Sequence, residues 1–593
     1  MKDFLKYTLA TLTGIVLAFL LCFFFGLMTI YSAVSSSQTT ASIEKNSVMT
    51  LNLNGVISER NNPTLLNLLQ DENDAYTGLD EILLAIKNAK EHEDIKGIHI
   101  VGSTSLSASV ASLQEIHDAL EDFKESGKFI TAYGDNYSQG AYYVASVADK
   151  LMMNPQGMLM WQGLASTPLF FKDLLDKIGV EMQIFKVGTY KSAVEPYMLM
   201  EMSDANREQM TSVIQSFWKN ITEDVAASRN ITTDKLNELA DQTTMFYPAI
   251  DALNNGMLDT LVYKNDVRDY LKHRIGVEKN RDLHLVSVTE MASVSSNKPK
   301  DKSGNIVAVY YAVGEIDSQT SSAMGEESIN SSKMISDLRD LQENKDVKAV
   351  VVRVNSPGGS AFGSEQLWHA ISELKKEKPV IISMGDYAAS GGYYLSAAAD
   401  FIVAEPTTLT GSIGIFGTMP NAQKLVKTIG INIDAVKTNK HSDLLSQAML
   451  TRPMTGEEAG LMQMYVNNGY DLFLTRVSEG RDLSKDRVDE IGQGRVWTGE
   501  QALAIGLVDE LGGIEKAVEI AVERAGIETY TRLSYPAPKS LWSQLLDLNP
   551  AGYVETRILK GKLGDLYYPY SYMNNFSIND MLQARMPYEL NIR

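Results

Sequence analysis

The chain has 593 residues, of which 44% are hydrophobic, so we expect two to four folded domains rather than a disordered chain. Its formal net charge of -20 disfavours nucleic acid and anionic lipid headgroups as partners. The single cysteine, Cys22, excludes an internal disulfide, and no two histidines have the spacing of a metal site. We therefore expect no metal and no cofactor.

The first predicted element is an apolar segment without charges, residues 7–30, which follows Lys2 and Lys6. At about 1.5 Å per residue, a helix of this length crosses the hydrocarbon core of a bilayer. It is longer than the apolar part of a signal peptide, although residues 33–35 could form a cleavage site. We therefore expect residues 1–34 to be a cytoplasmic N-terminus and one uncleaved transmembrane anchor, with the rest outside the cytoplasm.

The remaining chain consists of two related halves, about residues 48–270 and 305–530. In each half, β-branched segments typical of strands alternate with segments of helical periodicity, which indicates α/β units. A repeat of this length is a strong signal of duplication. We expect an N-terminal domain at 46–300 and a C-terminal domain at 304–535. The tail, 536–593, shows no recognisable chemistry, and we expect it to pack on the outside or on a neighbouring chain.

The two halves differ where chemistry is expected. The C-terminal half contains Asn355-Ser-Pro-Gly-Gly-Ser360, whereas the N-terminal half lacks both glycines at that place. Ser390 of the C-terminal half aligns with Gln139. In the opposite sense, Lys191 of the N-terminal half aligns with Ser442. Each half has therefore kept a residue type that the other half has lost.

Ser390 lies between small residues, Ala388-Ala389 and Gly391-Gly392, at the start of a predicted helix. Small neighbours allow a substrate backbone to approach closely. The backbone N–H of Gly391, together with that of Gly358 or Gly359, could bind the oxyanion of an acyl-transfer reaction. Either glycine motif alone is more often a turn or a packing contact. Their joint presence in one half favours a function.

A serine nucleophile needs a base, and two residues are candidates. His369 falls in a predicted helix, where an exposed or packed role is usual. Lys191 would have to be removed from water, because a lysine ordinarily titrates near 10.4. The chain has 54 lysines and arginines, so spacing alone does not select Lys191.

The chain resembles the signal peptide peptidase A family in its long, double-domain form. The segments that carry this resemblance are 190–196, 355–359, 388–393, 409–415, 494–499 and 504–509. The resemblance implies two tandem ClpP/crotonase-like α/β domains, Ser390 as the nucleophile and Lys191 as the general base. It further implies a hydrogen bond from Ser412 to the lysine, and backbone groups of Gly359 and Gly391 as the oxyanion hole.

The same resemblance implies a serine endopeptidase that degrades signal peptides left in the membrane after cleavage. It implies a homotetramer in the bacterial inner membrane, with a periplasmic catalytic part and peptides as substrates. Two other readings share the fold. An acyl-CoA enzyme of the crotonase type would need a carboxylate base and a basic patch for the CoA phosphates. A catalytically inactive membrane scaffold would not need Ser390, Lys191 and both glycines to be intact.

Overall fold

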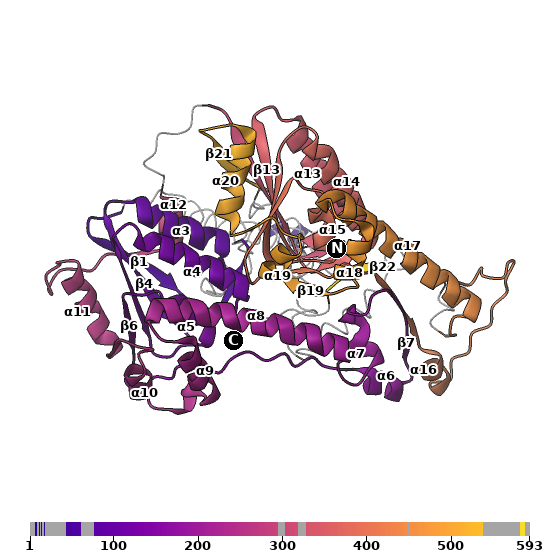
Figure 1. Ribbon diagram of the computed structural model, residues 1–593, viewed down its shortest axis with the longest axis horizontal. Coiled ribbons are helices and arrows are strands. Elements are labelled where there is room, and N and C mark those ends of the chain that lie inside the picture. Colours follow the sequence, from indigo (N-terminus) through magenta and orange to yellow (C-terminus); the bar gives the residue numbers. More distant parts are fainter. Residues whose placement is uncertain are drawn as a thin grey trace.

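The computed structural model shows a mixed α/β protein built around two large parallel sheets (Figure 1). The described residues are 6–8, 11, 13–14, 17, 43–60, 76–294, 303–317, 328–444, 446, 451–537, 562 and 582–586. The predicted membrane anchor falls almost wholly outside these residues. Within them, no helix is both long and apolar enough to span a bilayer.

The first sheet belongs to the N-terminal half and has six parallel strands in the order β8-β6-β5-β4-β1-β9. Its central strands are buried on both faces because helices cover the sheet from both sides, as parallel sheets require. In chain order the strands are β1 (Ser47–Asn52), β4 (Ile95–Gly102), β5 (Phe129–Gly134), β6 (Lys150–Met153), β8 (Thr260–Leu261) and β9 (Leu285–Ser287).

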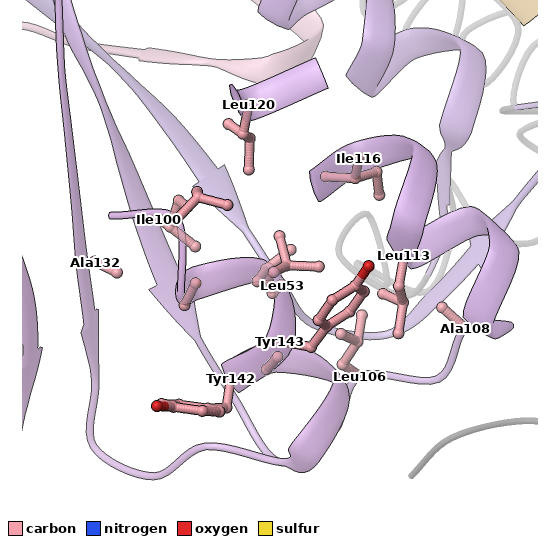
Figure 2. Packing of buried hydrophobic residues seen from close by; sticks show 14 of the residues in the cluster. Leu53, Ile100, Leu106, Ala108, Leu113, Ile116, Leu120, Ala132, Tyr142 and Tyr143 are labelled. Atoms are coloured by element: carbon pink, nitrogen blue, oxygen red, sulfur yellow. The ribbon is translucent and has the colours of Figure 1, made fainter. Parts of the chain in front are cut away.

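Apolar residues at helical spacing attach the helices to this sheet. Figure 2 shows Leu113, Ile116 and Leu120 of α4 directed toward Ile100 of β4 and the side chain of Tyr143. The opposite face is covered by α11, whose Val267 and Leu271 form a separate cluster with strand residues. The helices of this half are α3 (Leu79–Glu91), α4 (Val110–Lys124), α5 (Gln139–Ala145), α6 (Lys172–Ile178), α7 (Glu195–Met198), α8 (Asp204–Arg229), α9 (Thr233–Asp241), α10 (Ala249–Asn254), α11 (Lys264–Arg274) and α12 (Val288–Ser293).

The second sheet belongs to the C-terminal half and repeats this topology. Its path β20-β16-β15-β13-β10-β21 is parallel, and β17 and β19 extend it beyond β15. The predicted duplication is therefore visible in the strand order. The strands are β10 (Ile306–Val313), β13 (Val347–Ser356), β15 (Val380–Ala389), β16 (Phe401–Ala404), β17 (Leu409–Gly411), β19 (Val496–Thr498), β20 (Glu510–Leu511) and β21 (Thr531–Tyr535).

The helices of the C-terminal half also have counterparts in the first half. The long helices α8 and α17 have 26 residues each, and a serine or threonine caps the N-terminus of both. One sheet face is covered by α20 and the other by a larger helical layer. The helices are α13 (Ser331–Glu343), α14 (Ala361–Lys375), α15 (Gly391–Ser396), α16 (Gln423–Thr428), α17 (Gly456–Arg481), α18 (Lys485–Ile491), α19 (Gly499–Ala504) and α20 (Ile514–Ala525).

A third sheet joins segments that lie far apart in the sequence, in the order β12-β11-β14-β22-β18-β7. One of its strands, β7, comes from the N-terminal half and pairs with β18 of the C-terminal half. Another, β22, comes from the tail, so the expectation that the tail packs on the outside is wrong for this strand. The strands are β7 (Glu181–Lys186), β11 (Glu315–Ile316), β12 (Ser328–Ile329), β14 (Gly358–Ser360), β18 (Phe416–Asn421) and β22 (Leu582–Arg585).

A buried ionic cluster connects the two halves. Arg353 of β13 donates to Glu59 at 3.0 Å and to Glu115 at 2.7 Å, and both carboxylates belong to the N-terminal half. Asn355, the first residue of the Asn-Ser-Pro-Gly-Gly motif, donates to Glu59 and to Asp386 at 3.0 Å each. The motif is thus anchored to the other half by its first side chain.

Candidate active site

Ser390 stands at the turn between β15 and α15, where the parallel strand ends and the helix begins. Its backbone has φ 54° and ψ -110°, a conformation that is costly for any residue except glycine. The hydrogen bond from its N–H to the carbonyl oxygen of Gly411, at 2.8 Å, helps to hold this turn. The expectation that Ser390 begins a helix is confirmed.

The glycines near Ser390 are required by close packing. A Cβ on Gly358 would lie 1.9 Å from the carbonyl oxygen of Ala584 and 2.7 Å from the backbone nitrogen of Gly391. A Cβ on Gly391 would lie 2.5 Å from the hydroxyl oxygen of Ser364. The N–H of Gly358 donates to Ser356 at 3.2 Å, so this group already has a partner. Gly359, the other glycine considered from the sequence, lies opposite Ile316 of β11 and Ala584 of β22.

Lys191 reaches Ser390 from the other half of the chain. It follows β7 and precedes the short 3-10 helix η1 (Ser192–Val194). Its Nζ lies 2.8 Å from the Oγ of Ser390, 3.1 Å from the Oγ of Ser412 and 3.2 Å from the carbonyl oxygen of Ser412. All three residues have no exposed surface. The structure therefore brings together the three side chains that the resemblance singled out.

Burial changes the protonation of Lys191. The removal of the ammonium group from water lowers the pKa of Lys191 well below its usual value. Nearby carboxylates do not counteract this shift, because desolvation is the single cause of the pKa change. A lysine of this kind is neutral over a pH range in which ordinary lysines are charged, and a neutral amine can accept a proton.

Two glycines leave space for the lysine side chain. A Cβ on Gly494 would lie 2.6 Å from the Cβ and from the backbone nitrogen of Lys191, and a Cβ on Gly414 would lie 3.2 Å from its Cδ. Gly494 also has φ +78°, which favours glycine. The sequence motif that begins at Gly494 thus has a physical role that the sequence alone did not reveal.

Several residues that hold the lysine loop were missed from the sequence. Gln209 of α8 donates to Ser192 at 2.9 Å and to the carbonyl oxygen of Tyr190 at 3.1 Å, and it accepts from the N–H of Val496. Glu195, which is buried, accepts from the side chain of Asn206 at 2.9 Å and from Ser203 at 2.6 Å. The motif Tyr-Lys-Ser-Ala-Val-Glu-Pro could have suggested such roles, because Ser192 and Glu195 belong to it.

In the N-terminal half, other side chains occupy the place that corresponds to Ser390 and Ser412. The side chain of Gln139 accepts from the backbone N–H groups of Gln162 and Gly163, at 3.0 Å each, and donates to the carbonyl oxygen of Gly163. Trp161 lies as many residues after Gln139 as Ser412 lies after Ser390, and it is fully buried. An indole and a satisfied amide thus occupy this place in the described part of the N-terminal half.

The histidines of the C-terminal half lie elsewhere. His369 is exposed on α14. His441 lies near Glu457 and Glu458, at 3.2 and 3.3 Å. Neither one has a hydrogen bond to Ser390 among the described residues. Lys191 is therefore the basic side chain that the fold places beside the serine.

Comparisons with known proteins establish the class: the chain is a serine-type protease. The sequence profile of Peptidase family S49 matches residues 122–278 and again residues 372–528. The chain belongs to this family, in the long form with two repeats, which confirms the resemblance stated above.

Two relatives are similar over most of their length. The chain is 36% identical to Protease 4 of Salmonella typhi over 484 residues, 79% of this chain and 75% of that protein. It is 30% identical to the chloroplastic serine protease SPPA of Arabidopsis thaliana over 552 residues, 92% of this chain and 78% of that protein. Among solved structures, a ClpP1 mutant from Listeria monocytogenes matches 36% of this chain and 95% of its own with 14% identity and a TM-score of 0.23, too low to assign a fold.

Proposed function

We propose that this protease is a membrane-anchored endopeptidase that degrades cleaved signal peptides through a Ser390–Lys191 dyad. The observation that carries the proposal is the buried 2.8 Å contact between Lys191 Nζ and Ser390 Oγ. A serine hydroxyl is a weak nucleophile until an adjacent base removes its proton. Membership of Peptidase family S49 favours proteolysis over an acyl-CoA reaction or an inactive scaffold.

The hydrogen bonds around Lys191 suit a neutral amine. Such an amine has two N–H groups and one lone pair. The carbonyl oxygen of Ser412 can accept only, so it takes one N–H, and the Oγ of Ser412 takes the other. The lone pair of a neutral Lys191 would then face Ser390 Oγ and accept its proton, in place of the N–H that a charged lysine donates there. Ser412 is thus a positioning residue that orients the base.

In the first chemical step, Ser390 Oγ attacks the carbonyl carbon of the scissile peptide bond and its proton passes to Lys191. The developing oxyanion would be bound by backbone N–H groups of Gly391 and Gly359, and one such donor is typically worth about 3–4 kcal/mol of barrier. Lys191 then gives the proton to the leaving amine as the peptide bond breaks. Water hydrolyses the resulting acyl-enzyme with Lys191 again as the base.

The finer parts of the proposal concern substrate, location and assembly. Residues 1–34 would anchor the chain in the bacterial inner membrane, with the protease domains in the periplasm, next to signal peptides that remain in the bilayer. We further propose domains at 46–300 and 304–535, both ClpP/crotonase-like. A homotetramer would cover exposed aliphatic side chains, which are at least half exposed at Ile429, Ile431, Ile433 and Val436.

A serine-directed fluorophosphonate probe tests the dyad. The purified chain should be labelled at Ser390, and Ser390→Ala should lose both labelling and the turnover of casein or peptides. Gln139→Ala changes the corresponding position of the other half and should keep the wild-type rate. Turnover by Ser390→Ala, or labelling of a different serine, contradicts the assignment. Mass spectrometry of membranes from cells with and without the active chain should show signal peptide remnants accumulating without it.

A further inference from the structure

Strand β22 lies in the middle of the third sheet, between two strands that border the catalytic serine. It pairs antiparallel with β14, where Gly359 is opposite Ala584, and antiparallel with β18, where Phe416 is opposite Gln583. Strand β14 contains the proposed oxyanion glycine. Strand β18 follows Gly414, whose carbonyl oxygen lies 3.5 Å from the Oγ of Ser390. Figure 1 labels β22 within the C-terminal half, near α15 and α18.

The backbone of β22 comes close to the proposed oxyanion hole. The carbonyl oxygen of Ala584 and the backbone nitrogen of Gly391 both lie within 2.7 Å of the point where a Cβ on Gly358 would stand. A substrate carbonyl must reach this same neighbourhood before Ser390 can attack it. A peptide substrate and β22 therefore cannot occupy the groove between β14 and β18 together.

The side chains of β22 alternate as in a strand bound in a groove. Leu582 and Ala584 are buried, as is Met586 just beyond the strand, whereas Gln583 and Arg585 are partly exposed. Leu582 lies against Gly469 of α17, and Ala584 has no exposed surface.

The end of the strand is held by two further contacts. The N–H of Met586 donates to the carbonyl oxygen of Pro357 at 2.7 Å, and Arg585 pairs with Glu315 at 3.1 Å.

We infer that β22 is an autoinhibitory strand: it occupies the peptide-binding groove of the same chain, and a substrate must displace it. This inference rests on the proposed function, because it takes the groove beside Ser390 as the substrate site. The groove then accepts an extended peptide by strand addition, with a small residue at the place of Ala584 and an aliphatic residue at the place of Leu582.

The physical basis is competition between an intramolecular and an intermolecular strand. Because β22 is covalently attached, it competes at an effective concentration that for tethered segments is on the order of millimolar. The apparent affinity for substrate equals the intrinsic affinity multiplied by the fraction of chains whose groove is open. Main-chain pairing supplies most of the contacts, so peptides of many sequences can displace β22. The side chains of Ala584 and Leu582 determine how well the strand fits the groove.

Substitution at Ala584 in the full-length chain tests the inference. Ala584→Trp places a large side chain where no space exists and should release β22 from the groove. The rate constant for fluorophosphonate labelling of Ser390 and the kcat/KM for a peptide should each rise about tenfold, as expected if about one groove in ten is open in the wild type. The matched control is Gln583→Trp, on the outward side of the same strand, which should stay within about twofold of the wild type.

A second variant and an added peptide complete the test. Arg585→Glu places a second carboxylate beside Glu315 and should weaken the binding of β22 without disturbing its buried side. Both the labelling rate constant and kcat/KM should therefore rise. A synthetic Leu-Gln-Ala-Arg-Met peptide should slow the labelling of Ala584→Trp competitively, and a scrambled peptide should not. Wild-type rates in Arg585→Glu would overturn the inference even if Ala584→Trp fails to fold. If Ala584→Trp folds, an absence of competition by the peptide would overturn it as well. Failure of the proposed function would look different, because Ser390 would then remain unlabelled in every variant.

Discussion

The Nζ of Lys191 and the Oγ of Ser390 lie 2.8 Å apart, although the two residues are 199 positions apart and belong to different repeats. Strand β7, which leads to the lysine, pairs with β18 of the other half, and this pairing carries the lysine across. The N-terminal repeat contributes the lysine and the C-terminal repeat the serine. The described residues contain one serine–lysine pair of this kind. This arrangement fits the differences between the halves, in which Ser390 aligns with Gln139 and Lys191 aligns with Ser442.

Replacement of Lys191 by methionine should abolish activity and stabilise the protein. Activity should fall by at least about 10²-fold, the lower end of what a general base contributes. Burial lowers the pKa of Lys191, so folding forces the loss of a proton that the unfolded chain keeps. Between the folded and unfolded pKa values, this costs about 1.4 kcal/mol for each unit by which the pH lies below the unfolded pKa. Thermal melting at pH 7 should show a higher Tm for Lys191→Met, and the gain should shrink as the pH approaches 10.5. An unchanged or lower Tm would argue against a neutral buried lysine.

The activity should rise with pH as Lys191 loses its proton. Because desolvation lowers the pKa of Lys191, the midpoint of this rise should lie well below that of an ordinary lysine. The measurement is kcat/KM for a neutral peptide across the alkaline range, and it reports the free enzyme. A profile that shows no such rise, or a midpoint near 10.5, would contradict a lysine base.

Gly494 should be needed to position Lys191, and not only because its backbone conformation favours glycine. In Gly494→Ala the new methyl group would collide with Lys191, and we expect a loss of at least about tenfold in kcat, since a small misplacement at a reacting centre is costly. Gly506→Ala is the control, because φ is +82° there and the nearest atom would be 3.9 Å away. This control should lose roughly 1 kcal/mol of stability and keep its rate. Equal rates for both variants would remove the role given to Gly494.

The ionic cluster between the halves should make stability depend on pH through Glu59. Burial raises the pKa of Glu59 to about 7, from an ordinary value of 4.5. The folded state thus keeps a proton that the unfolded state releases, and the stability should fall as the pH rises from about 4.5 to about 7. Denaturant unfolding of Glu59→Gln should show a weaker dependence in this window. If the free energy of unfolding depends on pH equally in the wild type and in Glu59→Gln, Glu59 does not titrate in this window.

Removal of the central cation of this cluster should be strongly destabilising. Arg353→Met leaves Glu59 and Glu115 buried without the guanidinium that both accept from, and such a loss typically costs about 3–5 kcal/mol. Urea unfolding measures this cost, with Arg339→Met on the exposed face of α13 as the control. A cost below about 1 kcal/mol would mean that the halves are held together without this cluster.

The sequence by itself determined the duplication and the α/β class, and it indicated Ser390 as the candidate nucleophile. Strand and helix periodicities are local, so they are legible in each repeat, and the glycines around Ser390 mark a close approach of backbones. Lys191 was selected through its family motif, because a buried lysine and an exposed lysine look alike in a sequence of 54 cationic residues.

Only the tertiary structure decided which residues surround the lysine and what fills the groove. Gly494 and Gln209 act on Lys191 through contacts between segments far apart in the chain, and such contacts leave no periodic signal. The same reason applies to β22, a strand of four residues whose partners, β14 and β18, lie more than 150 positions earlier. Its pairing depends on the facing edges of β14 and β18, which come together only after the C-terminal half has folded.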